Sequence, residues 1–193
     1  QRAVDLCASL QGEAHPNTAC ALTDLAAVQR EQHKLSEAET NAGRAVASLR
    51  KGVGPTDVST ATALYNMAGL CKRQGRYDAA EAAYAEALRI FQEKLGNGQG
   101  ETADTLYQMG CLYRKKGDYL RAGNFFGDAA ESYTKTYGPT DKRVAESTRR
   151  QRAMVDKMVG GVTSHRHGKR SKPRSSAAAL RARQLAAARS DRG

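Results

Sequence analysis

The sequence lacks the features that mark membrane and secreted proteins. It has no run of eighteen consecutive apolar residues, whereas a helix that spans a bilayer needs about twenty predominantly apolar residues. No secretory signal opens the chain. Tryptophan is absent, and aromatic residues make up only 6% of the chain. We therefore expect no membrane span.

The sequence also lacks a metal-binding pattern. His165 and His167 flank Arg166, but two histidines supply too few ligands for a metal site. Cysteines without C-x-x-C spacing exclude the usual zinc boxes and favour a reduced, intracellular compartment. The four cysteines lie far apart and never form a C-x-x-C pair: Cys7, Cys20, Cys71 and Cys111.

No catalytic motif is present, neither a G-x-S-x-G elbow nor H-E-x-x-H. One glycine-rich stretch, "GNGQG" at residues 96–100, resembles a phosphate loop. It follows a predicted helix rather than a strand, and Glu101 replaces the third glycine of G-x-G-x-x-G. We interpret it as a corner between helices. The sequence predicts no cofactor, no small-molecule substrate and no enzymatic activity.

Four glycines, Gly12, Gly54, Gly96 and Gly138, lie 42 residues apart. This spacing predicts a repeated structural unit. Apolar positions keep the same 42-residue register: Leu22, Leu64 and Leu106; Leu25, Met67 and Met109; Ala38, Ala80 and Ala122; Ala45, Ala87 and Ala129.

Each unit is predicted to contain two antiparallel helices. In "TATALYNMAGLCKR" and in "YDAAEAAYAEALRIFQEKL", apolar residues recur at helical spacing. Gly75 lies between these segments, where a residue with positive φ is needed to end the first helix. Small residues at Ala68, Ala80, Gly110 and Ala122 are expected to let the helices approach closely.

These motifs resemble tetratricopeptide repeats of the long, 42-residue type found in kinesin light chains and nephrocystin-like proteins. The segments "TALYNMAGLCKRQGRYDAAEAAYAEALRIFQEKLG" and "ADTLYQMGCLYRKKGDYLRAGNFFGDAAESYTKTYG" are successive copies. The resemblance implies an all-α fold, a right-handed superhelical solenoid of antiparallel helix pairs. The first copy departs from the pattern, because His33 and Lys34 replace the turn glycine and Leu35 replaces the tyrosine.

The register predicts a solenoid over residues 1–159 and a basic tail over residues 160–193. In the final helix, Thr148 and Gln151 replace apolar positions, which suits a capping helix with one solvated face. The solenoid is divided into a partial repeat at 1–11, repeats at 12–53, 54–95 and 96–137, and a capping helix at 138–159.

The resemblance implies that the first helix of each repeat lines a concave groove that binds a peptide or a neighbouring subunit. Tyr65 and Tyr107 are either anchors for a partner or pack on each other across repeats. Asn66 and Gln108 either bond an extended peptide backbone or belong to a solvated face. Further groove positions are Cys20, Thr23, Asp24, Ala27, Arg30, Glu31, Thr62, Gly69, Asp104, Cys111, Ala153 and Lys157.

A ladder of basic pairs follows these positions. It would give the groove a positive field that favours an acidic partner segment. Alternatively, basic residues near a helix C-terminus offset the helix dipole. The pairs are Lys72 and Arg73, Arg114 and Lys115, and Arg149 and Arg150.

The tail, residues 160–193, holds nine Lys or Arg residues and one acidic residue. Its low apolar content predicts intrinsic disorder. It would attract RNA, an anionic membrane surface or an acidic polymer surface, or it is a nuclear address or a solubilising arm. The candidate polyanion-binding residues are Arg166, Lys169, Arg170, Lys172, Arg174, Arg181 and Arg183.

Together these patterns predict a non-catalytic, cytoplasmic scaffold for protein–protein interaction. The expected setting is a cytoskeletal assembly or a ciliary, axonemal one. The alternative is a structural subunit of a ribonucleoprotein complex such as a ribosome, mitochondrial or cytosolic, with the tail in contact with RNA.

Overall fold

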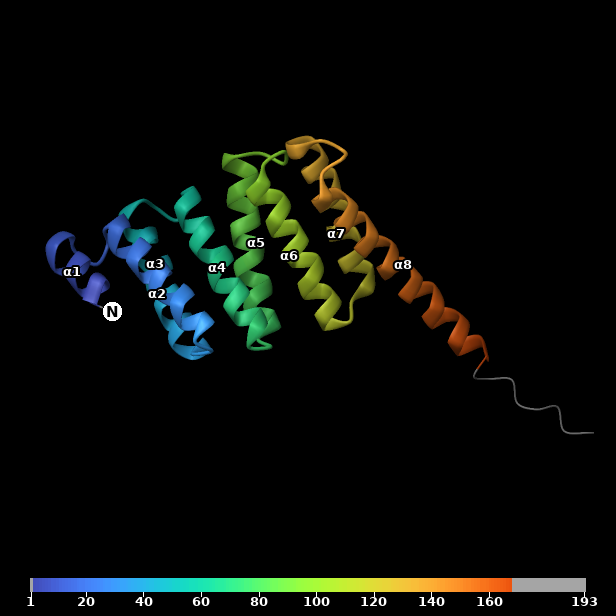
Figure 1. Ribbon diagram of the computed structural model, residues 1–193, viewed down its shortest axis with the longest axis horizontal. Helices are drawn as coiled ribbons and strands as arrows, with labels where there is room; N and C mark the ends of the chain where they lie inside the picture. The colour runs from blue at the N-terminus through green and yellow to red at the C-terminus, as the bar shows by residue number, and fades with distance from the viewer. Residues whose placement is uncertain (1, 168–193) are drawn as a thin grey trace, which may run out of the picture. The chain divides into compact units, whose positions relative to one another are not determined.

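The computed structural model describes residues 2–167, including the side chains of residues 2–158. The described residues form eight α-helices and no strand (Figure 1). This confirms the predicted all-α fold. The helices are α1 (Arg2–Gln11), α2 (Pro16–Glu31), α3 (Leu35–Gly52), α4 (Val58–Arg73), α5 (Tyr77–Lys94), α6 (Gly100–Lys116), α7 (Tyr119–Tyr137) and α8 (Lys142–His167).

The described residues up to Met158 form one compact unit, and the end of α8 from Val159 falls outside it. In this unit, three antiparallel helix pairs follow one another: α2 with α3, α4 with α5, and α6 with α7 (Figure 1). Helix α1 precedes them, and the first part of α8 follows them. The paired helices and their order are those of the predicted solenoid. The stretch "GNGQG" connects α5 to α6, as expected for a corner.

Helix α8 does not end where the basic tail was predicted to begin. It continues through Gly160 and Gly161 to His167. A glycine inside a helix costs about 1 kcal/mol relative to alanine but keeps its backbone hydrogen bonds, and no proline interrupts this segment. The start of the predicted tail at residue 160 therefore lies within a helix. Residues 168–193, and the disorder predicted for them, lie outside the described residues.

The turn inside each helix pair requires a left-handed backbone. Gly75 has φ +78° and Gly117 has φ +82°, as the sequence predicted for Gly75. In the first pair the same position is His33, with φ +61°, and no other non-glycine residue in the described part of the chain has positive φ. The departure from the repeat pattern at His33 therefore keeps the turn and adds backbone strain.

A buried threonine ties each of three links to the helix that follows it. Thr18, Thr60 and Thr102 are fully buried. Their hydroxyls donate to the carbonyl oxygens of Gly12, Gly54 and Gly96, at 2.8, 2.8 and 2.9 Å. The threonines share the 42-residue register, which the sequence-based prediction did not use. At the fourth position Val144 has no hydroxyl, so α8 lacks this bond.

The core is formed where small residues meet large rings. Ala68, Ala80 and Ala122 are fully buried, as expected for close helix approach. A Cβ added to Gly110 would lie 2.8 Å from the ring of Phe126. Phe126 is itself fully buried, so the ring has no space to retreat. The absence of a side chain at Gly110 thus allows the packing of α6 on α7.

His33→Gly should stabilise the solenoid by about 0.5–1 kcal/mol. Glycine removes the energetic cost of positive φ, and the greater conformational entropy that glycine loses on folding offsets part of this gain. His33 is exposed, so its side chain contributes little packing. The measurement is the free energy of unfolding by denaturant.

Gly75→His is the reciprocal control, and a Cβ there meets no atom within 4 Å. It should destabilise by about the same amount. A His33→Gly variant that is less stable than the wild type would contradict the assignment of strain to this turn.

Thr60→Val should destabilise the protein by about 1–2 kcal/mol, because the Gly54 carbonyl loses its buried donor while the side-chain volume is kept. Thr62→Val is the matched control: Thr62 is exposed and donates to the Val58 carbonyl of the same helix. The control should change the unfolding free energy by less than about 0.5 kcal/mol. Equal effects for the two variants would refute a special role for the link.

Candidate functional site

The predicted groove positions lie on α2, α4 and α6, the first helices of the three pairs, and on α8. A hollow along α4 and α6, here called the tyrosine cavity, has a volume of about 570 Å³. A smaller hollow of about 70 Å³ lies between α2, α3 and α4 and includes Thr23, Arg30 and Asn66. The tyrosine cavity is lined by Tyr65, Asp104, Tyr107, Gln108, Tyr133, Lys142, Arg143 and Glu146.

The two predicted tyrosine anchors line the tyrosine cavity from one side. Tyr65 packs edge-on against Tyr84, with ring centroids 5.7 Å apart. Tyr107 packs in the same way against Phe126, at 5.5 Å. Each ring is therefore held by the second helix of its own pair rather than by the other tyrosine. Burial raises the pKa of Tyr65, and burial also raises that of Tyr107. Both side chains are half-buried, and both line the cavity.

An acidic group lies within the same cavity. The Tyr133 hydroxyl of α7 donates to the Asp104 carboxylate of α6 at 2.5 Å. Burial raises the pKa of Tyr133, and the hydrogen bond to Asp104 raises it further. Tyr133 thus remains a proton donor that fixes the Asp104 carboxylate. Donors on a partner would find one negative acceptor at a defined place.

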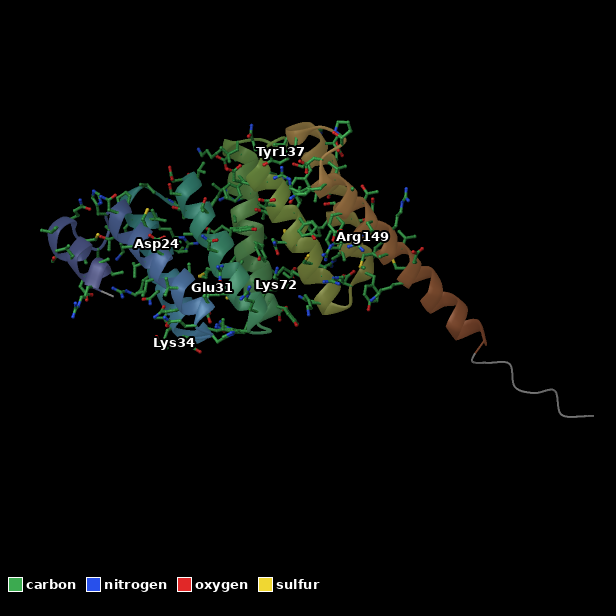
Figure 2. All side chains as sticks on the ribbon, viewed as in Figure 1. Asp24, Glu31, Lys34, Lys72, Tyr137 and Arg149 are labelled. Carbon is green, nitrogen blue, oxygen red and sulfur yellow. The ribbon has the colours of Figure 1, made fainter. Side chains whose placement is uncertain are left out.

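A cationic cluster adjoins the cavity at the ends of α4 and α6. Lys72 donates to Gln108 Oε1, and its Nζ lies 5.5 Å from the centroid of the Tyr84 ring. Figure 2 shows Lys72 near the C-terminal end of α4. Burial lowers the pKa of Lys72. Three neighbouring cations lower it further: Arg73, Arg114 and Lys115.

Arg73, Arg114 and Lys115 are exposed, and none of them forms an ion pair within residues 2–158. Each of these charges disfavours the charged form of Lys72. An anionic group placed between them would relieve that repulsion. The first four predicted basic residues therefore form one connected cluster beside the tyrosine cavity.

The last predicted pair behaves differently. Arg150 lies 5.2 Å from the centroid of the Tyr107 ring and is ion-paired with Glu146 at 2.6 Å. Arg149 also pairs with Glu146, at 2.7 Å, and lines a separate hollow on α8. Hydrogen bonds from Arg150 and Arg149 hold the pKa of Glu146 below its ordinary value. Glu146 therefore offsets part of the charge predicted for this end of the ladder.

Several lining residues were missed by the sequence-based prediction because they come from α7 and α8. Arg143 stacks 3.5 Å from the centroid of the Tyr137 ring and pairs with Asp141 at 3.0 Å. Lys142 lies beside it at the start of α8. A signal was present, since Tyr133 and Tyr137 lie four residues apart on one helix. Of these two, Tyr133 lines the cavity, and only the packing of α7 on α6 brings it there.

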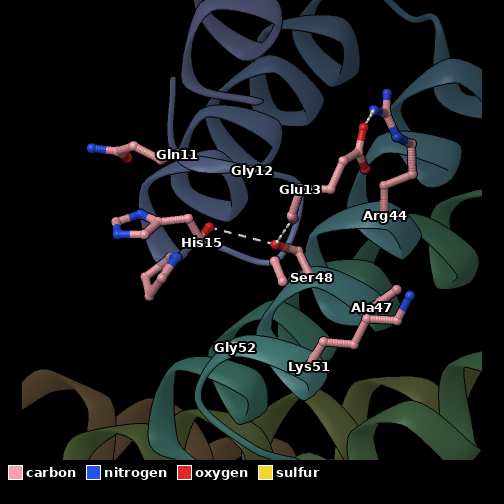
Figure 3. A pocket seen from close by; sticks show the side chains of 11 residues that line it. Gln11, Gly12, Glu13, His15, Arg44, Ala47, Ser48, Lys51 and Gly52 are labelled. Atoms are coloured by element: carbon pink, nitrogen blue, oxygen red, sulfur yellow. Dashed lines mark hydrogen bonds and ion pairs between the residues drawn. The ribbon is translucent and has the colours of Figure 1, made fainter. Parts of the chain in front are cut away.

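A further hollow of about 640 Å³ lies at the first link, between the end of α1 and the end of α3 (Figure 3). Ser48 donates to the Glu13 carbonyl at 2.5 Å, and Arg44 pairs with the Glu13 carboxylate at 3.2 Å. Ser132 likewise donates to the Asn97 carbonyl at the third link. These polar groups have hydrogen-bond or ion-pair partners within the chain. We therefore interpret the hollow as part of a link that is held by its own contacts, and not as a binding site.

Within the described residues, no group of three or more His, Cys, Asp or Glu side chains is arranged to hold a metal ion. None of the described helices is both long and apolar enough to cross a membrane. Of the predicted polyanion-binding residues, Arg166 lies in the last turn of α8, where only the backbone is described. The other six lie outside the described residues: Lys169, Arg170, Lys172, Arg174, Arg181 and Arg183.

Comparison with known proteins agrees with the fold. The family model "Tetratricopeptide repeat" matches residues 59–135. Comparison with curated protein sequences gives no match. The matched segment covers the second and third helix pairs, where the predicted resemblance to tetratricopeptide repeats is strongest.

Solved structures share the solenoid. BtubC (BKLC) from P. vanneervenii has a TM-score of 0.63 and 21% identity, over 85% of this chain and 70% of that one. A variant of nearly identical TPR-like repeats, from a Podosopora anserina protein assigned to the kinesin light chains, has a TM-score of 0.71 and 15% identity, over 85% and 77%. A second structure of those repeats has a TM-score of 0.60 and 15% identity, over 80% and 83%. These neighbours confirm the predicted likeness of the fold to kinesin-light-chain-like repeats.

Proposed function

We propose that this chain, whose residues 59–135 match the tetratricopeptide repeat family, is a non-catalytic scaffold that binds an acidic segment of a protein partner. The segment lies along α4, α6 and the start of α8. Its aromatic or apolar side chain enters the tyrosine cavity, and its carboxylates lie on the cationic cluster. Kinesin-light-chain-like neighbours support a cytoskeletal setting, in the cytoplasm or in a cilium.

The observation that carries this proposal is the side-by-side position of the cavity and the cluster. Gln108 belongs to both, because it lines the cavity and accepts a hydrogen bond from Lys72. Tyr65 and Tyr107 present rigid ring edges, which bury area at low entropic cost. Arg114 and Lys115 supply charges that have no partner within residues 2–158. An anchor beside unpaired cations favours an acidic, extended segment.

The prediction is that random-peptide phage selection on the whole chain enriches acidic sequences. Arg114→Glu with Lys115→Glu should weaken the binding of those peptides by at least about tenfold, because attraction becomes repulsion. Fluorescence anisotropy with fluorescein-labelled, enriched peptides measures the dissociation constant. Both residues are exposed, so the fold should be unaffected.

The matched control is Arg89→Glu with Lys94→Glu, which makes the same charge change on α5. Arg89 and Lys94 are exposed surface residues and line neither hollow of the groove. The control should leave affinity within about twofold, because distant exposed charges are screened by salt. The proposal would be wrong if neutral or basic peptides were enriched, or if both double variants lost the same amount of affinity.

A further inference from the structure

The first helix pair lacks the aromatic pair that the other two helix pairs place beneath the groove. In the second and third pairs, a tyrosine of the first helix packs edge-on against a ring of the second helix. These ring pairs are Tyr65 with Tyr84 and Tyr107 with Phe126. At the same register positions the first pair has Thr23 and Ala42. Two large side chains are thus replaced by two small ones.

The hollow of about 70 Å³ between α2, α3 and α4, here called the small hollow, lies where these rings are missing. Thr23 of α2 and Ala42 of α3 both line it. The other lining residues are Ala26, Ala27, Arg30, Ala45, Ala63, Asn66 and Leu70.

The surroundings of the Tyr84 ring match the lining of the small hollow. A Cβ added to Gly69 would lie 3.6 Å from the Tyr84 hydroxyl, and Lys72 Nζ lies 5.5 Å from the ring centroid. The residues that adjoin this ring have register counterparts that line the small hollow. These counterparts are Thr23 for Tyr65, Ala27 for Gly69 and Arg30 for Lys72.

The surroundings of the Phe126 ring give the same result. Gly110 adjoins this ring, and the Arg150 guanidinium lies 5.9 Å from its centroid. Their register counterparts in the first pair are Ala26 and Asn66, which also line the small hollow. The small hollow is therefore the space that an aromatic ring of the second helix fills in the other two pairs.

The small hollow is apolar at its base and opens at the groove. Ala26, Ala42 and Leu70 are each 4% exposed and belong to one buried cluster. Ala27 is exposed and Thr23 is half-buried, and both are predicted groove positions. The Thr23 hydroxyl donates to the Ala19 carbonyl of its own helix. An apolar group fits this base, whereas a polar group would lose its hydrogen bonds to water there.

A cation at the rim continues the cationic cluster onto α2. Arg30 lines the small hollow and shares its register with Lys72 and Arg114. Its ion pair with Glu31 joins side chains that are 40% and 71% exposed, so this pair offsets little of its charge. A segment whose carboxylates lie on the cationic cluster therefore meets a further positive charge beside the small hollow.

We propose that the small hollow is a second anchor site, which receives an apolar side chain of the partner segment, up to the size of a phenyl ring. The inference rests on the proposed function, because it extends the same groove. Asn66 lines the small hollow and the adjacent Tyr65 lines the tyrosine cavity, so α4 contributes to both. The partner's side chain takes the place of the missing ring, and burial of its apolar surface stabilises the complex.

Ala42→Phe tests the proposal, because it supplies from within the chain the ring that the first pair lacks. The probes are fluorescein-labelled peptides obtained by phage selection on the wild-type whole chain. Their dissociation constants, measured by fluorescence anisotropy, should rise at least about tenfold, since the anchor side chain is no longer buried. Thermal unfolding should show equal or higher stability, because the ring fills a hollow.

Thr23→Tyr is the second variant, and it decides the outcome if Ala42→Phe does not fold. It places a ring at the groove side of the small hollow and should weaken binding in the same way. Ala85→Phe on α5 is the matched control, because Ala85 is exposed and lines neither hollow of the groove. The control should leave the affinity within about twofold.

Unchanged affinity in the folded variants would overturn the proposal. If Arg114→Glu with Lys115→Glu still weakened the same peptides, the proposed function would stand without a second anchor. Selected peptides that are not acidic would refute the proposed function, whereas a loss of their affinity in Ala42→Phe would still support the anchor site. Self-association of the wild type that Ala42→Phe abolishes would make a second copy the occupant and overturn the proposal.

Discussion

The hydrogen bond from a buried threonine to the link glycine is the constraint on which the rest of the solenoid depends. The glycine carbonyl has just left one helix, and the threonine lies in the first turn of the next, so the bond fixes the angle between them. Because Thr18, Thr60 and Thr102 recur every 42 residues, the same bond recurs at three links. The repeated bond places each first helix in the same way after its link, and these first helices carry the groove.

The groove combines aromatic and acidic side chains that are held in place with cations that have no ion-pair partner within the described residues. Its aromatic rings are fixed from below by Tyr84 and Phe126, which are fully buried. Its acid, Asp104, is fixed by Tyr133. In contrast, the exposed Arg73, Arg114 and Lys115 beside it each disfavour the positive charge on Lys72. The fixed rings offer a partner contact area without a large entropic cost of ordering the scaffold. The positive charges beside them orient an acidic partner.

The 42-residue register of the sequence predicted the helices and their turns. It did not predict the contacts between helices that are distant in the sequence. Register alone predicted the helix pairs, the turn at Gly75 and the close approach at Gly110. It placed Tyr65, Tyr107 and Gln108 on the first helices, where they line the cavity. It could not predict that Glu146 offsets Arg149 and Arg150, nor that α7 contributes Tyr133, because these contacts depend on how successive pairs pack. The buried threonines were predictable, since they obey the same register.

The three links differ in how firmly they are held. At the first link Ser48 adds a second bond to that of Thr18, and at the third Ser132 and Thr136 add two to that of Thr102. At the second link Ile90 replaces the serine, and Thr60 makes its bond without such an addition. The junction between α3 and α4 is held by side chains of the helices instead, because Gln74 donates to the Leu35 carbonyl and Arg76 pairs with Glu39. The fold therefore joins successive helix pairs in two ways, through the carbonyl groups of a link or through side chains that cross from one pair to the next.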